Sequence, residues 1–357
     1  MDTQTPERPA ARGRKAGADD TPVRTVNLAL QGGGAHGAFA WGVLDRLLEE
    51  ERLAFEGVSA TSAGAMNAVV LAYGLAEGGR EGARQALTGF WRRISHAAAM
   101  GPLQPSVVDR ALHNHALDYS PAFVMLDFMS RLLSPYQLNP ANYNPLQRLL
   151  EQAVDFEQLR RKSPVKLFLS ATNVRTGKVK VFTNEEITAD AVMASACLPF
   201  MFQAVEIDGE AYWDGGYMGN PAIFPLIYHC DSPDVVIVHI NPIERPEIPR
   251  SATEIMNRIN ELSFNSSLMR EMRAIAFVTR LIDEGALADG TLKRMNVHAI
   301  AADEVMRGLS VMSKLNADWE FLTHLRDDGR AAADAWLARH FDRIGVDSTI
   351  DIPARYL

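Results

Sequence analysis

The stretch that decides the fold is Gly57-Val58-Ser59-Ala60-Thr61-Ser62-Ala63-Gly64-Ala65-Met66. Its first half is an apolar run that can form a short strand, and from Ala63 onward the residues change to helix formers. Ser62 therefore lies between a strand and a helix, which is the place of a nucleophile elbow. There a tight turn exposes the hydroxyl, and the helix N-terminus stabilises nearby negative charge. Serine is also a preferred N-cap, so this stretch taken alone favours a helix cap.

A glycine loop lies just before that stretch. Residues 26–30 predict a buried strand, Gln31-Gly32-Gly33-Gly34-Ala35-His36-Gly37 follows at once, and residues 38–50 predict an amphipathic helix. The order is thus strand, glycine loop, helix, strand, elbow, helix. This alternation predicts an α/β fold with a mostly parallel sheet and helices on its faces.

The glycine loop allows three interpretations. Gly32, Gly34 and Gly37 match the G-x-G-x-x-G dinucleotide fingerprint, but the second strand ends in Ala60-Thr61-Ser62 without the acidic residue that would hold a ribose. A plain turn accounts for one or two of the glycines. An oxyanion hole uses successive backbone N–H groups, each worth roughly 3–4 kcal/mol in acyl transfer. We favour the oxyanion hole, whose predicted members are Gly32, Gly33, Gly34 and Ala35.

Asp214 is the third element of the predicted site. Residues 205–207 and 211–213 flank Asp208-Gly209, a strong hairpin signal, and the second strand delivers Asp214 before Gly215-Gly216. Two glycines predict a sharp bend that leaves the carboxylate uncovered; taken alone, an Asx turn explains the aspartate better. The histidines after Asp214 lie in no turn-rich loop. A Ser–Asp dyad needs none, because a partly desolvated carboxylate can itself take the serine proton.

The rest of the chain continues the α/β pattern. Strands are predicted at residues 165–171, 178–182, 235–240 and 295–300, and helices at 82–97, from 145, and at 189–196, 252–285 and 316–341. Residues 1–23 have almost no large apolar side chains and predict a disordered tail. We therefore expect one domain over residues 24–357, with core motifs at 26–241 and a helical C-terminal extension at 252–345.

The composition of the chain argues against several classes of protein. The chain has 357 residues and a formal net charge of −8, which argues against a nucleic-acid partner. Two cysteines do not form a disulfide framework, and no run approaches the roughly 18 apolar residues of a spanning helix. The N-terminus has no apolar signal segment. These features favour a cytoplasmic protein.

Three ordered motifs carry a resemblance to a known family: the glycine loop with Ala38-Phe39, then Thr61-Ser62-Ala63-Gly64-Ala65-Met66-Asn67, then Asp214-Gly215-Gly216. Further similarity runs through Ala194-Ser195-Ala196-Cys197-Leu198-Pro199-Phe200, Gly219-Asn220-Pro221 and Ser313-Lys314-Leu315-Asn316-Ala317-Asp318-Trp319. The chain resembles a bacterial patatin-like phospholipase over nearly all of its length after the tail. The three motifs in this order are specific, although each alone is weak.

The resemblance implies a three-layer α/β/α sandwich and lipid acyl hydrolysis by a Ser–Asp dyad. Ser62 would attack the ester carbonyl of a lipid or related acyl ester, and Asp214 would act as the base. Backbone N–H groups of Gly33, Gly34 and Ala35 would hold the oxyanion, with no metal or organic cofactor. Peripheral contact with the inner membrane surface, through an apolar patch such as residues 123–133, would give access to lipid. A homodimer through the helix at 255–282 stays open.

The chain departs from the family pattern at two positions. Ala60 stands where the G-x-S-x-G motif has its first glycine, whereas Gly64 keeps the second. His36 stands where the family's loop commonly carries Arg or Lys, so it is the candidate for a head-group or loop contact. Ala60, Gly64, Gly215 and Gly216 are the expected supports of the elbow and loops. The alternative to an enzyme is a catalytically silent lipid- or partner-binding protein on the same fold.

Overall fold

The computed structural model describes residues 22–101, 120, 125, 129, 132–286 and 290–357. Most of the predicted N-terminal tail and most of the apolar patch at residues 123–133 lie outside these residues. From that patch, Met125, Met129, Leu132 and Leu133 are described, and the side chains of Met125 and Leu132 are exposed.

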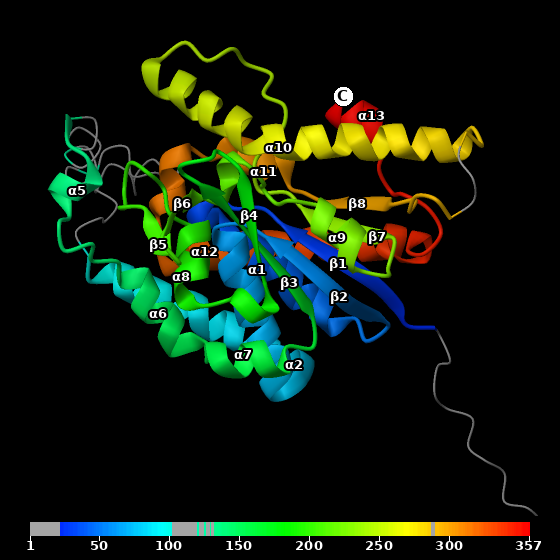
Figure 1. The fold of residues 1–357 in the computed structure, drawn as a ribbon, viewed down its shortest axis with the longest axis horizontal. Helices are drawn as coiled ribbons and strands as arrows, with labels where there is room; N and C mark the ends of the chain where they lie inside the picture. The colour runs from blue at the N-terminus through cyan, green and yellow to red at the C-terminus, as the bar shows by residue number, and fades with distance from the viewer. Residues whose placement is uncertain (1–21, 102–119, 121–124, 126–128, 130–131, 287–289) are drawn as a thin grey trace, which may run out of the picture.

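Eight strands of the described chain form one mixed sheet in the order β5-β6-β3-β2-β1-β7-β8, with β4 paired to β3 (Figure 1). The pairs β1/β2, β2/β3, β1/β7 and β7/β8 are parallel, whereas β4, β5 and β6 join antiparallel. The strands are β1 (Arg24–Leu30), β2 (Leu53–Ala60), β3 (Lys166–Asn173), β4 (Val179–Thr183), β5 (Val205–Ile207), β6 (Glu210–Asp214), β7 (Asp234–Val238) and β8 (Asn296–Ile300).

Alternate side chains of the buried strands separate two hydrophobic cores. In β1, Leu28 and Leu30 belong to the core that packs against one helical layer, whereas Ala29 belongs to the core on the opposite face. The first layer contains α1 (Gly37–Glu49), α2 (Ala63–Ala99), α6 (Pro145–Ala153), α7 (Phe156–Lys162), α8 (Ala189–Ser195) and α12 (Trp319–His340). The second contains α9 (Phe224–His229), α10 (Ala252–Asp283) and α13 (Ile352–Tyr356) (Figure 1). The predicted three-layer α/β/α sandwich is confirmed.

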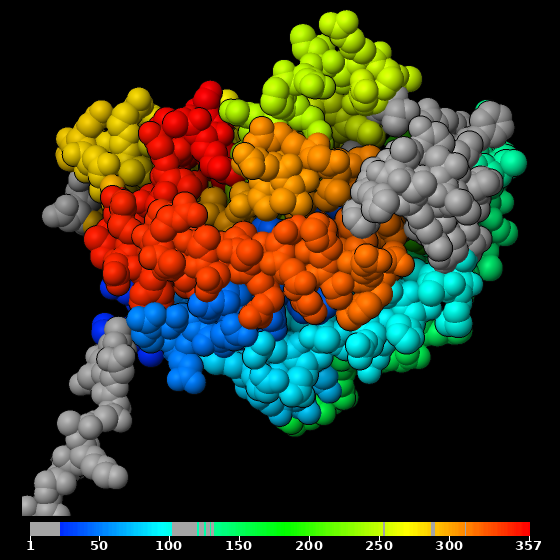
Figure 2. Space-filling model, turned by 180° about the vertical axis from the view of Figure 1, so that it is seen from behind, coloured from blue at the N-terminus to red at the C-terminus, as the bar shows by residue number. Residues whose placement is uncertain are grey.

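The C-terminal segment belongs to the same sandwich. β8 pairs in parallel with β7, so the strand predicted at residues 295–300 is confirmed and adds to the central sheet from within the C-terminal extension. From behind, residues 316–344 form an orange-to-red band beside the blue α1 and the cyan α2 (Figure 2). Further short elements include α5 (Pro135–Leu138), α11 (Asp303–Gly308), and the 3-10 turns η2 (Asn184–Glu186) and η5 (Phe341–Arg343).

One predicted local structure differs in detail from the observed fold, and another is confirmed. The helix that follows Ser62 and the helix predicted at residues 82–97 form one segment, α2, which bends where Gly78 and Gly79 leave helical backbone angles. Gly79 has a φ of 60°, which glycine adopts without a Cβ penalty. The predicted hairpin at Asp208-Gly209 is confirmed: both residues have positive φ, 52° and 79°, as a two-residue turn with right-handed strand twist requires.

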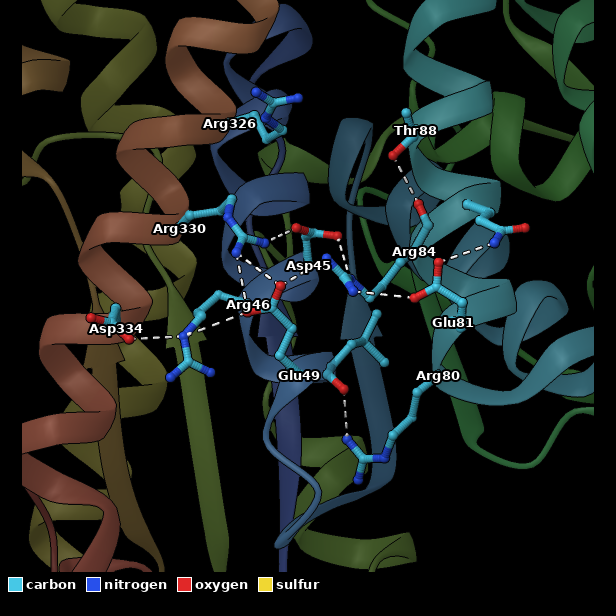
Figure 3. Close-up of polar contacts among 12 residues, drawn as sticks. Asp45, Arg46, Glu49, Arg80, Glu81, Arg84, Thr88, Arg326, Arg330 and Asp334 are labelled. Atoms are coloured by element: carbon cyan, nitrogen blue, oxygen red, sulfur yellow. Dashed lines mark hydrogen bonds and ion pairs between the residues drawn. The ribbon is translucent and has the colours of Figure 1, made fainter.

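A network of ion pairs joins α1 to the two helices beside it (Figure 3). Asp45 of α1 is nearly buried and accepts from Arg84 of α2 and from Arg330 of α12. The same two arginines also reach Glu49, one turn further along α1. Because Asp45 is withdrawn from water, removing either arginine would leave part of its charge uncompensated. The network therefore fixes α12 against α1.

Two glycines let α1 and α12 approach backbone to backbone. A Cβ on Gly42 would lie 1.9 Å from the carbonyl oxygen of Arg326, and one on Gly329 would lie 2.1 Å from that of Phe39. Neither neighbour is a flexible side chain, so a methyl group at either position forces the helices apart.

We expect Gly42→Ala to lower the free energy of unfolding by about 1–3 kcal/mol, because the overpacking cost exceeds the gain in helix propensity. Urea denaturation followed by circular dichroism measures this change. Gly89→Ala in α2 is the matched control, since nothing lies within 4 Å of a Cβ there. It should leave stability unchanged or raise it slightly. Equal stability of the two variants would show that α1 and α12 do not pack as described.

Candidate active site

Ser62 has a strained backbone at the junction of β2 and α2. Its φ and ψ are 56° and −123°, an unfavourable region for a residue with a Cβ, and its side chain makes no capping hydrogen bond to the helix. An N-cap serine has extended backbone angles and bonds the first turn of the helix. The geometry therefore excludes the helix-cap interpretation and matches a nucleophile elbow.

The elbow is held by close backbone contacts. A Cβ on Gly64 would lie 2.4 Å from the carbonyl oxygen of Leu30, so only glycine lets α2 start this near the end of β1. The Ser62 N–H donates to Ser195 Oγ at 2.9 Å, and Thr61 Oγ1 donates to the carbonyl of Gly219 at 2.6 Å. These bonds fix Thr61 and the backbone of Ser62.

Ala60, the departure from the G-x-S-x-G pattern, fits the strand without strain. It is the last residue of β2, is fully buried, and pairs with Leu30 of β1 and Leu169 of β3. Positive φ values of non-glycine residues occur among the described positions at Ser62, Asn142 and Asp208 and not at Ala60. The backbone therefore places no demand for glycine at position 60, and the strain lies on Ser62 itself.

Asp214 ends β6 and is fully buried. Its N–H donates to the carbonyl of Cys197 at 2.7 Å, and its own carbonyl accepts from Thr172 Oγ1 at 2.8 Å. In the side chain, Oδ1 accepts the Gly216 N–H at 2.7 Å, whereas Oδ2 has no hydrogen-bond partner among the described residues. The expectation of an uncovered carboxylate was wrong.

The two glycines after Asp214 serve close packing and not exposure. A Cβ on Gly215 would lie 2.1 Å from the carbonyl oxygen of Ser170, and one on Gly216 would lie 1.8 Å from the ring of Phe264. The turn η3 (Gly215–Tyr217) is therefore pressed between β3 and α10. Phe264, from α10, lies over the turn that holds Asp214 and helps to keep water from it.

Burial raises the pKa of Asp214 to about 7. Three interactions with the ionised form oppose this rise: the Gly216 N–H, the Ser62 hydroxyl and the charge of Lys314. The Ser62 hydroxyl thus lies close to the carboxylate, although no well-formed hydrogen bond joins the two side chains. Such bonds are often loose before substrate binds. A carboxylate with a pKa near 7 and an unbonded oxygen is suited to act as a general base.

The glycine loop is held on both sides of Gly32. The Gly32 N–H donates to Asn220 Oδ1 at 2.7 Å, and its carbonyl accepts from Asn241 Nδ2 at 2.8 Å. Its N–H is therefore already used, and Gly32 was wrongly included among the oxyanion donors. After it the chain turns into η1 (Gly34–His36), where Gly34 has a φ of 57°. No described residue accepts from the N–H groups of Gly33, Gly34 or Ala35, so these three remain candidates.

A buried cluster of amides supports the loop, and the sequence did not reveal it. Gln31 Oε1 accepts the backbone N–H groups of Ile240 and Asn241 at 2.9 and 3.0 Å. Its Nε2 faces Asn265 Oδ1 of α10 at 3.3 Å. Asn220 and Ser195 lie in segments that carried the family resemblance, which was the available signal for them.

The buried side chain of His36 contacts Ser313 beside the glycine loop and cannot reach a lipid head-group. Its side chain is 3% exposed, and Nε2 lies 2.7 Å from Ser313 Oγ. Burial, with a smaller contribution from Lys314, holds the pKa of His36 well below its usual range, so the ring is neutral. The head-group expectation was wrong, and the loop contact is what the structure contains. Its partner Ser313 belongs to η4 (Val311–Leu315).

The described residues contain no group of three or more His, Cys, Asp or Glu side chains that could hold a metal ion. Within the same part of the chain, none of the helices has the length and apolar character needed to span a bilayer.

Comparison with known proteins identifies a family that matches more than half of the chain. The patatin-like phospholipase family matches residues 28–227, which contain the glycine loop, Ser62 and Asp214. No curated protein sequence matches the chain.

Among solved structures, VipD from Legionella pneumophila is 16% identical with a TM-score of 0.43, covering 89% of this chain and 67% of VipD. ExoU in the ExoU-SpcU complex of Pseudomonas aeruginosa is 14% identical with a TM-score of 0.37, covering 90% of this chain. The match spans 53% of the ExoU chain, about half its length.

Proposed function

Because this chain belongs to the patatin-like phospholipase family, we propose that it is a lipid acyl hydrolase with Ser62 as nucleophile and Asp214 as general base. One observation carries the proposal. A serine at a strained elbow, with φ 56°, stands beside a fully buried carboxylate whose Oδ2 has no hydrogen-bond partner among the described residues. Strain at a serine and burial of an unpaired carboxylate both cost stability, and both are typical of active sites.

The first half of the reaction forms an acyl-enzyme. Asp214 takes the proton of the Ser62 hydroxyl as Oγ attacks the ester carbonyl, and a tetrahedral intermediate forms. Its oxyanion accepts hydrogen bonds from the N–H groups of Gly33, Gly34 and Ala35 in the loop. When the ester C–O bond breaks, protonated Asp214 gives the proton to the leaving alkoxide. The acyl chain is then bound to Ser62.

The second half releases the fatty acid. The carboxylate of Asp214 takes a proton from water, whose oxygen attacks the acyl carbonyl, and the same loop holds the second oxyanion. Collapse of this intermediate returns the proton to Ser62 Oγ and frees the acid. No other proton carrier is required, because Asp214 itself takes and returns each proton, and its pKa of about 7 suits both roles near neutral pH.

The proposed substrates are fatty-acyl esters of phospholipids or related lipids. His36 is buried and neutral, so we assign it no contact with a phosphate, and the acyl ester defines the substrate class. Cytoplasmic location, peripheral membrane contact and a homodimer stay predictions.

We expect the purified protein to release p-nitrophenol from p-nitrophenyl acyl esters and fatty acid from phospholipid vesicles. Mass spectrometry of the products identifies the bond that is cut, and a fluorophosphonate probe should label Ser62. Vesicle binding without product release, and with Ser62 unlabelled, would instead indicate the silent lipid-binding protein on the same fold.

A further inference from the structure

Lys314 lies beside the predicted oxyanion loop although it comes from the far end of the chain. It belongs to η4, which Ser310 caps and His36 contacts through Ser313. The main chain of Lys314 touches the loop directly: a Cβ on Gly34 would lie 2.4 Å from its carbonyl oxygen. The backbone of η4 thus forms one wall against the loop at Gly34.

The side chain of Lys314 reaches the loop at a second point. Its Nζ donates to Asn241 Oδ1 at 2.8 Å, and Asn241 Nδ2 donates to the carbonyl of Gly32 at 2.8 Å. The ammonium group therefore orients the amide that holds Gly32. Because a lysine ammonium has only donors, it fixes which end of the Asn241 amide faces the loop.

The same ammonium group stands near the dyad. Nζ lies 5.9 Å from the centroid of the Phe264 ring, and Phe264 packs on Gly216 beside Asp214. The positive charge of Lys314 lowers the pKa of Asp214, against the rise that burial causes. Burial in turn lowers the pKa of Lys314 to about 8, while Glu261 and Asp214 oppose this change.

The other titratable groups near Lys314 and Asp214 are either paired or uncharged. Glu261 accepts from Arg245 at 2.6 Å and from Arg258 at 3.2 Å, so two arginines already compensate its charge. His36 is neutral, and the thiol of Cys197, with its pKa raised to about 12 by burial, is uncharged. Tyr217 is uncharged as well, since burial raises its pKa to about 12.

We propose that Lys314 is a positioning residue of the hydrolytic site, which orients Asn241 against the oxyanion loop and places a positive charge near Asp214. The inference rests on the proposed function for its effect on turnover. Its effect on the ionisation of Asp214 does not depend on any activity. Lys314 touches no reacting atom; it acts through Asn241 and through its field at Asp214.

The test compares Lys314→Met, Lys314→Arg and the wild type by two measurements. Infrared titration follows the carboxylic-acid C=O band of Asp214, identified by its loss in Asp214→Asn. In Lys314→Met the midpoint should rise by about one pH unit, because an opposite charge is lost.

The second measurement is ester hydrolysis at a pH where Asp214 is ionised. The kcat of Lys314→Met should fall about 10- to 100-fold with KM within about twofold, as for a displaced catalytic group. Lys314→Arg should keep the wild-type midpoint and recover most of kcat.

Lys166→Met is the matched control. Lys166 Nζ also donates to a side-chain oxygen, that of Glu56, at 2.9 Å. It lies at the first residue of β3, whereas Ser62 follows the last residue of the parallel strand β2, so the two are at opposite edges of the sheet. It should change neither measurement. An unshifted midpoint in Lys314→Met, or an arginine variant as impaired as the methionine variant, overturns the proposal. A wild type without ester hydrolysis would refute the proposed function instead, and the titration would still decide the role of the charge. Should Lys314→Met not fold, Lys314→Gln takes its place.

Discussion

Ser62→Ala should lower kcat/KM for ester hydrolysis by about 10⁴-fold or more, because removal of a catalytic nucleophile leaves only binding and the oxyanion hole. The variant should still bind lipid, since only one oxygen atom is lost. It should also lose labelling by a fluorophosphonate. Steady-state kinetics on a p-nitrophenyl ester and gel fluorescence of the probe measure both effects.

Ser163→Ala separates this result from a general effect of losing a serine. Ser163 follows α7, where its hydroxyl donates to the carbonyl of Val165 at 2.7 Å, before the first residue of β3. Its loss should leave the kinetics unchanged. Wild-type turnover by Ser62→Ala would show that another residue is the nucleophile and that the strained elbow has a different purpose.

Asp214→Asn should reduce activity to a similar extent and remove the pH dependence near neutrality. In the wild type the base must be ionised, so kcat/KM should rise with pH and level off above about 7, the pKa of Asp214. Asparagine cannot accept the serine proton. Any remaining rate should show no inflection near pH 7 when kcat/KM is measured from pH 5 to 9.

The same substitution should affect stability with a defined sign. The pKa of Asp214 is about 7 in the folded protein and about 3.9 in an unfolded chain, so the native state binds the proton more tightly. The stability that this protonation contributes is present below about pH 4 and is lost as the pH rises through about 7. Melting temperatures of Asp214→Asn relative to the wild type should therefore increase between pH 5 and 8.

Asp208→Asn provides the control for both measurements. Asp208 lies in the turn of the same hairpin with a φ of 52°, which asparagine tolerates well. Its substitution should alter neither the pH profile nor the stability difference. A wild-type pH profile in Asp214→Asn would exclude Asp214 as the base.

The sequence was informative where a local pattern fixes a local structure. A strand, a glycine run, a helix, a second strand and a serine before small residues specify an α/β unit with a turn at Ser62, because each signal lies within a few residues of the element it determines. Asp208-Gly209 specified a hairpin for the same reason. The order of the motifs, with Asp214 third, then identified the family.

The rest depended on contacts between distant segments, which periodicity does not encode. Gln31 meets the N–H of Ile240 across 209 positions, and Lys314 reaches Asn241 across 73. His36 looked like a polar group near the surface, and only the packing of η4 and α12 buries it. Glycines after Asp214 suggested an open turn, whereas Phe264 of α10 fills that space. In each of these cases, tertiary packing decides what local composition leaves open.

The position of Lys314 in the chain has a consequence for synthesis on the ribosome. The elbow and Asp214 emerge first, and the residue that braces the loop emerges 100 positions after Asp214 (314 minus 214). At about 5–20 residues per second, the nascent chain carries both residues of the proposed dyad for about 5–20 seconds before η4 can dock. α12, which closes over α1, emerges later still. The proposed site is thus complete only after residues 311–340 have emerged, when the sandwich can form and enclose Asp214.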